Sequence, residues 1–347
     1  MYLGKSTSRH RWLSSSILML LLFYSTACSW NIRSGSIETK SASTYATSIT
    51  VPALPGQQIW KQGISSFLFG TNDTYEWSNH NIQTDVAIQH ALRSAGFTLI
   101  RSFFPDKAND AVIEQRIKTI ENSGAHCLGV ITNISNGTFD EHLLRYLGKR
   151  CQMYEFGNES DLNNISIKTY LTQWNTLIPL LRQINPTASF IGPVTYNDQG
   201  NHNYMQEFLT GVKASGILPD AVSFHWYPCY QDTRDSCLTK ASSFAQVAIE
   251  VRTLVRSTLG NDLPIGITEW NYDPGNPPPS YGDNPTFMTQ FSMNALYSMA
   301  QAGVAFACQF DAASYSGYGR LDMFDVGNDQ PKPQYFAIKS VIVRYRP

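Results

Sequence analysis

The feature that most constrains the fold is an alternation of two kinds of segment, which begins near residue 64 and continues to the end of the chain. Short apolar runs rich in β-branched residues alternate with longer amphipathic segments, a pattern typical of βα units and a parallel sheet. The apolar runs predict eight strands, over residues 66–70, 98–103, 126–132, 153–156, 189–194, 221–225, 265–268 and 304–310.

The segments between these runs predict helices. Apolar side chains recur at helical spacing between Tyr170 and Leu181 and again between Phe287 and Met299, and a final helix is expected over residues 334–345. Eight βα units predict an α/β fold of the (β/α)₈ TIM-barrel type, formed as a single domain. The competing architecture, a doubly wound open sheet, lacks the glycine-rich phosphate loop that would follow its first strand.

The N-terminus has the pattern of an export signal. Lys5, Arg9 and Arg11 precede a short apolar run over residues 17–24. This run is shorter than the ~20 residues that a membrane-spanning helix needs. The expected organisation is a signal peptide or lipoprotein signal over 1–28, a Ser/Thr-rich linker over 29–55 and one catalytic domain over 56–347.

The end of this signal leaves two forms of export open. The sequence Ser25-Thr26-Ala27-Cys28 resembles a bacterial lipobox, in which Cys28 is lipidated and tethers the protein to a membrane. Ser25 stands where that motif prefers Leu, and plain secretion without a tether is the alternative. Both forms place the folded domain outside the cytoplasm.

The remaining cysteines fit an oxidising compartment. Cys229 and Cys237 bracket a short polar loop and predict a local disulfide. Cys127, Cys151 and Cys308 fall in predicted strands, where they are expected to be small buried apolar residues; a bridge between Cys127 and Cys151 is the alternative for that pair. No Cys/His pair has zinc spacing, so neither a metal nor a cofactor is expected.

The composition excludes one class of partner and leaves another open. The net charge is −1 and no basic stripe runs along any segment, which excludes an electrostatic surface for nucleic acid. Charged residues make up only 15% of the chain and aromatic residues 12%. The aromatic residues fit either a large core or rings that stack on sugars.

Polar and aromatic residues follow the predicted strands directly. In a TIM barrel the active residues lie at the C-terminal ends of the strands, so these positions are the candidate site. In chain order they are Asn72-Asp73, Arg101, Asn133, Asn158-Glu159, Tyr196-Asn197, His225-Trp226-Tyr227, Glu269-Trp270 and Gln309 to Asp311.

Two acids stand out among these residues. Glu159 ends the fourth predicted strand and Glu269 ends the seventh, so their side chains can face each other across the barrel mouth. Glycosidic-bond hydrolysis needs such a pair, in which one acid protonates the leaving oxygen and the other attacks the anomeric carbon. Either Glu taken alone would more often be a helix-capping acid, and the pairing is what favours catalysis.

These motifs resemble those of the clan A glycoside hydrolases. The sequence from Gly157 to Asp161 is similar to their Gly-Asn-Glu-Pro-Asp motif, with Ser160 in place of Pro, and residues 191–193, 223–227 and 268–270 resemble further segments of the clan. The resemblance extends over residues 64–345. It is shared among the β-xylosidase/iduronidase, heparanase/β-glucuronidase and glucanase branches.

The resemblance implies a role for each acid. Glu159 would be the general acid and then the general base, and Glu269 the nucleophile. Arg101 would keep Glu269 ionised, and ionised Glu269 would raise the pKa of Glu159. The alternative for Arg101 is a salt bridge at the rim.

The other expected contacts are with the sugar or between site residues. Asn158 would bind the sugar 2-hydroxyl, while His225 and Tyr227 would orient the carboxylates. His225 has the alternative of a satisfied core histidine. The remaining substrate-binding candidates are Asn72, Asp73 and Trp270, the last of which could equally be a core residue.

The sequence therefore predicts a retaining glycoside hydrolase that cleaves a β-linked oligo- or polysaccharide by double displacement. The alternative is a non-catalytic barrel that binds glycans at the cell surface, which has no need of two opposed carboxylates. Other hydrolase chemistries find no support, because the chain has neither a Gly-x-Ser-x-Gly elbow nor a His-Glu-x-x-His motif.

Overall fold

The computed structural model describes residues 51–73, 82–197, 202–275, 277–314, 318–325 and 327–347. The predicted signal over 1–28, Cys28 and most of the predicted linker lie outside the described residues. The description begins just inside that linker, at Val51, and Leu54 is already buried beneath the barrel.

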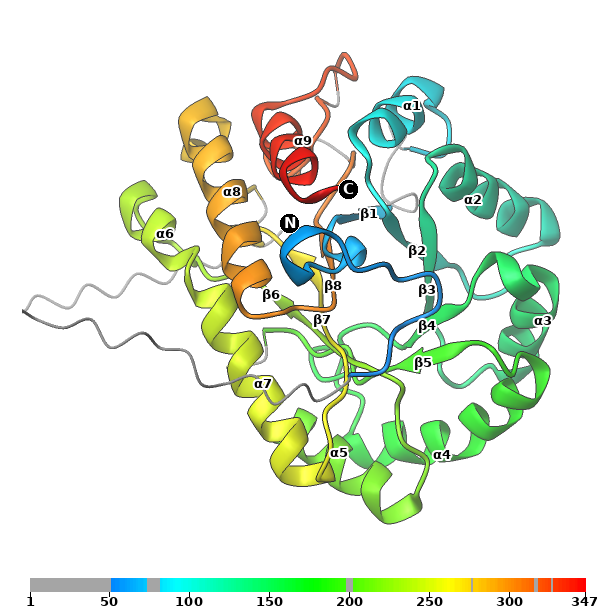
Figure 1. The fold of residues 1–347 in the computed structure, drawn as a ribbon. Coiled ribbons are helices and arrows are strands. Elements are labelled where there is room, and N and C mark those ends of the chain that lie inside the picture. The colour runs from blue at the N-terminus through cyan, green and yellow to red at the C-terminus, as the bar shows by residue number, and fades with distance from the viewer. Residues whose placement is uncertain (1–50, 74–81, 198–201, 276, 315–317, 326) are drawn as a thin grey trace, which may run out of the picture. The chain divides into compact units, whose positions relative to one another are not determined.

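Eight parallel strands form a nearly closed barrel, ringed by helices (Figure 1). The strand order is β5-β4-β3-β2-β1-β8-β7-β6, and single bridges from Ile191 to Ala221 and from Thr195 to Phe224 join the two ends. The strands are β1 Gly70–Asp73, β2 Leu99–Phe104, β3 His126–Ile131, β4 Met153–Phe156, β5 Ser189–Ile191, β6 Val222–Trp226, β7 Ile265–Trp270 and β8 Phe306–Gln309. The prediction of a (β/α)₈ TIM barrel is confirmed.

The helices follow the predicted alternation, with one short addition, α6, after β6. They are α1 Val86–Ala95, α2 Asp110–Asn122, α3 Gly137–Leu147, α4 Ile167–Ile184, α5 His202–Ser215, α6 Arg234–Lys240, α7 Ser243–Leu259, α8 Pro285–Gln301 and α9 Pro333–Tyr345. Polar side chains accept hydrogen bonds from backbone N–H groups at the start of six of them: Asp85, Asn109, Asn136, Ser166, Thr233 and Asn284. Such caps satisfy N–H groups that have no partner within the helix.

The first strand was predicted four residues too early. Residues Ser66–Leu68 form the short 3₁₀ helix η2, and β1 begins only at Gly70. The side chain of Phe67 is fully buried in a cluster beneath the strands. Phe67 is therefore apolar because it closes the barrel from below, as a plug, and not because it forms a strand. An apolar run of this length does not distinguish the two, which explains the error.

The interior of the barrel is layered. An apolar floor is formed by side chains from successive strands together with the plug beneath them: Leu54, Phe67, Leu99, Leu128, Met153, Ile191, Ala221, Phe306 and Cys308. Side chains alternate along a strand, so Arg101 lies on the same face as Leu99, and Glu155 on the same face as Met153. The floor therefore supports a charged layer directly below the mouth.

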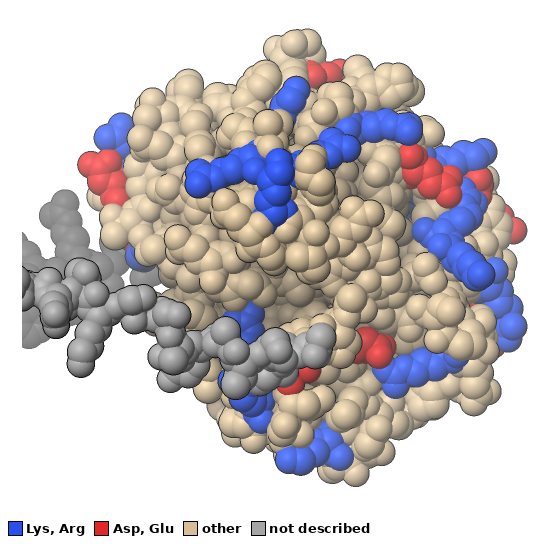
Figure 2. Space-filling view, viewed as in Figure 1, with Lys and Arg blue, Asp and Glu red and all other residues tan. Residues whose placement is uncertain are grey.

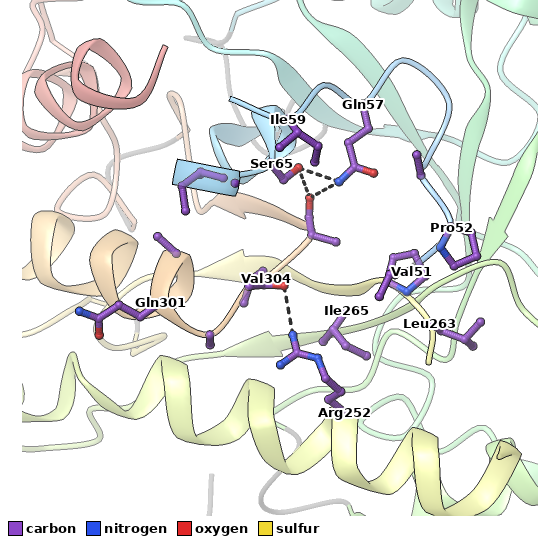
Figure 3. A pocket seen from close by; sticks show the side chains of 18 residues that line it. Val51, Pro52, Gln57, Ile59, Ser65, Arg252, Leu263, Ile265, Gln301 and Val304 are labelled. Carbon is purple, nitrogen blue, oxygen red and sulfur yellow. Dashed lines mark hydrogen bonds between the residues drawn. The ribbon is translucent and has the colours of Figure 1, made fainter. Parts of the chain in front are cut away.

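The opposite, N-terminal end of the barrel has a cavity of about 590 Å³ beside the starts of β7 and β8 (Figure 3). Gln57 and Ser65 donate hydrogen bonds to the carbonyl of Ala305 at its wall, and Arg252 donates to that of Gly303. No acid or histidine is among the described residues that line it. Uncharged residues cover most of this face of the molecule, and the charged ones stand singly or in small groups (Figure 2). Features at this end of a TIM barrel normally concern stability rather than catalysis.

Two disulfides are present in the described part of the chain. Cys229 is bonded to Cys237, which confirms the predicted local bridge, and Cys127 is bonded to Cys151, the alternative that the sequence left open. Cys308 is free and buried in the barrel floor, as expected. No helix among residues 51–73, 82–197 and the later described ranges is long and apolar enough to cross a membrane.

The apolar floor predicts a stability difference between two leucines. Leu128 is fully buried in the floor, whereas Leu180 on α4 is 41% exposed. We expect Leu128→Ala to lower the free energy of unfolding by about 2–5 kcal/mol, because it leaves a cavity that cannot collapse. The matched Leu180→Ala variant should change it by less than about 0.5–1 kcal/mol. Urea unfolding followed by circular dichroism measures both, and equal losses would contradict the layered description.

Candidate active site

The two predicted acids meet at the C-terminal mouth of the barrel. One carboxylate oxygen of Glu159, one of Glu269 and a ring nitrogen of His225 all lie within 4.8 Å of one another. The Glu159 side chain is 16% exposed and that of Glu269 is 8% exposed, so both are reached from the cleft while most of their surface is buried. Side chains from strand ends β4, β6 and β7 thus converge on one point.

A bulge in β7 turns Glu269 toward the barrel axis. Phe224 pairs with Ile267, but the next residue, His225, pairs with Glu269, so β7 has one extra residue at Thr268. The same shift recurs against β8 on the other side. Strict alternation would have placed Glu269 outward beside Ile267. The extra residue reverses that orientation, which is a common use of bulges next to active sites.

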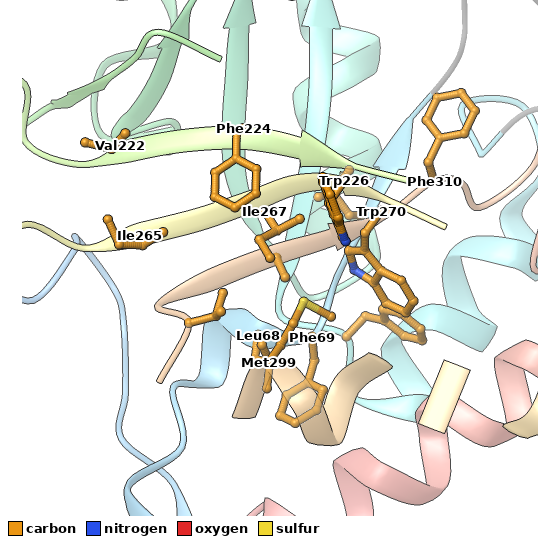
Figure 4. Packing of buried hydrophobic residues seen from close by; sticks show 14 of the residues in the cluster. Leu68, Phe69, Val222, Phe224, Trp226, Ile265, Ile267, Trp270, Met299 and Phe310 are labelled. Carbon is orange, nitrogen blue, oxygen red and sulfur yellow. The ribbon is translucent and has the colours of Figure 1, made fainter. Parts of the chain in front are cut away.

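The same bulge corrects the prediction for Trp270. Its side chain points away from the mouth into the hydrophobic layer between strands and helices (Figure 4). There it is 1% exposed and lies edge-on to Phe244. The residue is therefore reassigned from substrate contact to core packing, the alternative that the sequence left open.

Glu159 stands on a backbone that few residues adopt. Gly157 has a φ of 89° and Glu159 a φ of 46°, both in the left-handed region. Gly157 tolerates this without a Cβ clash, whereas Glu159 bears a strain of about 1–3 kcal/mol that the surroundings must offset. The Glu159 N–H donates to the Val194 carbonyl at 2.9 Å, and its own carbonyl accepts from Asn163 at 2.9 Å. These bonds fix the direction in which the Glu159 side chain extends from the backbone.

Arg101 is the centre of the charged layer and is completely buried. Its Nη1 lies 2.7 Å from the Glu269 carboxylate and 2.9 Å from the Asn72 side-chain oxygen, and its Nη2 donates to Asn158 at 2.5 Å. Burial alone would lower the pKa of Arg101, but the charges of Glu155 and Glu269 raise it above its usual value. It is therefore a fixed cation inside the barrel, and the alternative of a rim salt bridge is wrong.

Glu155 is the site residue that sequence reasoning missed. It is fully buried on β4, accepts from Arg101 Nε at 2.5 Å, and accepts from the Ser223 hydroxyl at 2.6 Å. The signal was present in the sequence: Glu155 is four residues before Glu159 and on the interior face of an apolar strand. An acid at such a position is almost never left unpaired.

His225 and Tyr227 contact the two acids. His225 Nδ1 lies 2.6 Å from Glu159 and 3.5 Å from Glu269, and the Tyr227 hydroxyl donates to Glu269 at 3.0 Å. The backbone of Tyr227 is held in turn by the Asn197 side chain, which accepts from its N–H and donates to its carbonyl. Burial raises the pKa of the Tyr227 hydroxyl well above its usual range, so this group remains a donor.

The pKa of Glu159 departs from the expectation. Burial alone raises it, but the charge of His225 and the hydrogen bond from its ring lower it below the usual value. Burial alone lowers the pKa of His225, whereas the charges of Glu269 and Glu159 raise it. The expectation that Glu269 raises the pKa of Glu159 overlooked the imidazole between them. The lowered pKa of Glu159 and the raised pKa of His225 both favour an ionised carboxylate beside a protonated imidazole.

Asn72 and Asp73 lie below the cleft rather than in it. Asn72 is fully buried and donates to backbone carbonyls of Thr268, Cys308 and Gln309 while accepting from Arg101. Asp73 is 1% exposed and accepts from Ser102 at 2.7 Å. The structure therefore places Asn72 as a support for the charged layer and Asp73 in a separate buried cluster with Ser102 and Arg116, and neither as a substrate contact.

A cavity of about 370 Å³ opens over the two acids. Its walls are mostly aromatic or apolar, and the described lining residues are Asn158, Glu159, Leu162, Tyr196, Tyr227, Tyr230, Glu269, Pro274, Gly275, Phe310, Tyr318 and Leu321. Apolar walls with a few convergent polar groups are typical of small-molecule sites. Tyr230 and Tyr318, which sequence reasoning did not single out, come from loops whose positions only the folded barrel brings together.

The three convergent groups also have the composition of a metal-ligand set. Glu159, His225 and Glu269 could each offer one atom to a cation. The guanidinium of Arg101, 2.7 Å from Glu269, already supplies the positive charge at this point. A second cation would be repelled by it, so the geometry favours acid–base chemistry.

Part of the chain matches a known family, and the fold matches solved structures. Residues 152–302, which include Glu159, His225 and Glu269, match the family model described as glycosyl hydrolase catalytic core. Similar solved structures include a glucosidase from Croceicoccus marinus, with 17% identity and a TM-score of 0.61 over 79% of this chain and 65% of that one. A family 51 α-L-arabinofuranosidase from Bifidobacterium longum has 9% identity and a TM-score of 0.61 over 81% and 73%.

A third similar structure is a 4-O-α-L-rhamnosyl-β-D-glucuronidase from Fusarium oxysporum, with 11% identity and a TM-score of 0.61 over 84% of this chain and 71% of that one. The chain spans about two thirds of the length of the Croceicoccus marinus glucosidase. A search of curated protein sequences found no match. At these identities the structural likeness shows the fold.

The barrel and the matched region are similar to those of the clan A glycoside hydrolases. Within the chain, residues 152–302 match the glycosyl hydrolase catalytic core, and the similar solved structures share the barrel fold. The resemblance that the sequence motifs indicated is thereby confirmed by the fold and by the family match over residues 152–302.

The buried ion pair predicts an unequal response of two glutamates. Glu155→Gln removes a carboxylate from the interior and leaves Arg101 less compensated, so we expect the free energy of unfolding to fall by about 3–5 kcal/mol. Glu121 pairs with Arg150 at 2.7 Å but is 45% exposed. The matched Glu121→Gln variant should cost less than about 1 kcal/mol. Denaturant titration of both variants measures the difference. If Glu155→Gln lowers the free energy of unfolding no more than Glu121→Gln does, the Arg101–Glu155 pair does not stabilise the fold.

The imidazole predicts a linked titration. The raised pKa of His225 means that this group stabilises the fold below its unfolded pKa of about 6.5 and loses that contribution as pH rises through its folded pKa. Glu159→Gln removes one of the charges that raise it, so we expect the His225 titration midpoint to fall. Nuclear magnetic resonance of the ring nitrogens measures it, with Glu121→Gln as the unchanged control. An unchanged midpoint in Glu159→Gln would show that the two groups do not share a proton.

Proposed function

We propose that the protein is a retaining glycosidase that cleaves β-linked glycosides by double displacement, with Glu159 as general acid and base and Glu269 as nucleophile. The observation that carries this proposal is the short distance between the two acids: one carboxylate oxygen of Glu159 lies within 4.8 Å of one carboxylate oxygen of Glu269. Retaining enzymes separate their carboxyl groups by about 5–5.5 Å, whereas inverting enzymes leave about 6.5–9.5 Å for a water molecule.

The surroundings of Glu269 suit a nucleophile. Arg101 at 2.7 Å and the Tyr227 hydroxyl at 3.0 Å stabilise the ionised carboxylate and fix its orientation. These contacts favour attack on the anomeric carbon, which forms a covalent glycosyl–Glu269 ester as the bond to the leaving oxygen breaks. Tyr227 keeps its own proton, so it does not compete in the reaction.

The surroundings of Glu159 suit proton delivery. We propose that entry of the substrate moves the shared proton from His225 Nδ1 to Glu159, which then donates it to the leaving oxygen. In the second step ionised Glu159 accepts a proton from water, the resulting hydroxide attacks the anomeric carbon, and Glu269 is released. The proton returns to the His225–Glu159 pair, so both steps balance.

Asn158 is proposed to bind the sugar hydroxyl next to the reacting carbon. Its side-chain oxygen accepts from Arg101 and its side-chain nitrogen is therefore directed elsewhere, at a position that lines the cavity beside Glu159. A donor held in this way by a buried cation is preorganised, which reduces the cost of binding.

We also propose that the protein is exported. Two disulfides in the described domain support an oxidising compartment, in agreement with the signal pattern over residues 1–28. Tethering through lipidated Cys28 and free secretion are both compatible with that support.

Variants of the two acids test the mechanism. Glu159→Ala should lower kcat/KM for glycosides with poor leaving groups by about 10²–10⁴, because they need protonation, and should affect activated aryl glycosides much less. Glu269→Gly should abolish turnover, and azide should restore part of it. Product stereochemistry, followed by nuclear magnetic resonance of the anomeric proton, should show retention. Wild-type rates in both variants, or an inverted product, would contradict the assignment.

A further inference from the structure

Tyr230 is an exposed ring at the edge of the catalytic cavity. It lies in the loop between β6 and α6, lines the cavity and is 72% exposed. Single exposed aromatic side chains are common and need no explanation by themselves. The other described aromatic residue exposed to a similar degree, Phe336 at 55%, lies on α9 and does not line this cavity. Tyr230 therefore differs from Phe336 in lying at the cavity, and this position needs an explanation of its own.

The loop that carries Tyr230 is held from several sides. The preceding residue, Cys229, is fully buried, is bonded to Cys237 on α6 and donates its N–H to the Tyr272 carbonyl at 2.8 Å. The N–H of Tyr230 itself donates to Asp232 at 3.1 Å. Asp232 also accepts from Ser236 and, at 2.7 Å, from Lys240. The backbone that carries the exposed ring is thus held in place before any ligand arrives.

A buried acid joins this loop to the next wall of the cavity. Asp273, which is 3% exposed, accepts from the N–H of Gln231 at 3.2 Å and from that of Gly275 at 2.8 Å. Gly275 and Pro274 line the cavity after β7, as Tyr230 does after β6. The two loops therefore present one continuous, preorganised wall.

The chemistry of this wall indicates an uncharged, ring-shaped ligand. Tyrosine offers a large flat surface at a low cost in conformational entropy. The described residues that line the cavity include the acids Glu159 and Glu269 and no Lys or Arg, so a carboxylate on the ligand would find no cation. A neutral sugar ring, with one apolar face and hydroxyls at its rim, fits both properties.

We propose that Tyr230 is the platform of a second sugar-binding subsite, which takes a neutral sugar ring linked to the one held at Glu159 and Glu269. The inference rests on the proposed glycosidase mechanism and extends it to the substrate class: a glycan of at least two uncharged units. Because the loop backbone beneath the ring is held before binding, little cost of ordering the loop reduces the stacking contribution.

The test compares substrates with and without a second ring. The pairs are β-glucosyl fluoride with cellotetraose, β-xylosyl fluoride with xylotetraose and β-mannosyl fluoride with mannotetraose, each with wild type, Tyr230→Ala, Tyr230→Phe and Phe336→Ala. For the tetrasaccharide that wild type cleaves, we expect Tyr230→Ala to raise KM about threefold to tenfold and Tyr230→Phe to stay close to wild type. The fluoride should be unaffected by any variant, and Phe336→Ala should match wild type throughout.

The outcomes separate this inference from the mechanism. An unchanged tetrasaccharide KM in Tyr230→Ala, or an equal loss on the fluoride, overturns the subsite. If wild type cleaves none of the pairs, the catalytic proposal fails, and the subsite is judged by calorimetric titration of the three tetrasaccharides. Weaker binding of a tetrasaccharide to Tyr230→Ala than to wild type then supports the subsite. Equal affinity for both proteins, or no binding to wild type, overturns the subsite.

Discussion

The buried guanidinium of Arg101 is the interaction on which the site depends. A cation completely removed from water is stable only when anions and polar oxygens surround it, and Glu155, Glu269, Asn72 and Asn158 meet that need. These contacts with Arg101 thereby fix the position of the Glu269 carboxylate and of the Asn158 amide beside Glu159, the two acids proposed to be catalytic. The apolar floor beneath keeps water away from the ion pairs, which strengthens them. Stability and catalytic geometry are in this way consequences of the same set of contacts.

Much of the architecture could be predicted from the sequence, for a physical reason. Strands buried on both faces are predominantly apolar, so β3 and β8 stood out as apolar runs, and β2, β4 and β7 as apolar runs that carry a few polar residues. The positions of Glu159 and Glu269 on the fourth and seventh strands follow from counting alone. The disulfide between Cys229 and Cys237 was predictable because only a short loop separates them.

The rest depended on contacts that periodicity does not encode. Phe67 fills the barrel from below instead of continuing a strand, and nothing in the local sequence distinguishes a plug from a strand. The ionisation of Glu159 depends on His225, which is distant in the sequence and 2.6 Å away in space. The loop that carries Tyr230 is held by Asp273, which belongs to another loop and accepts a hydrogen bond from the N–H of Gln231. Each of these features requires the register of the folded barrel.

The bulge at Thr268 has a consequence for how relatives of this chain are compared. One extra residue decides whether the acid or the tryptophan of the pair Glu269-Trp270 faces the barrel axis. An alignment that places a gap one position away would superpose a reacting group on a core residue, while leaving every neighbouring match intact. At this strand, the spacing of residues decides as much as residue type which side chain faces the barrel axis, and a relative that lacks the extra residue would present a different side chain there.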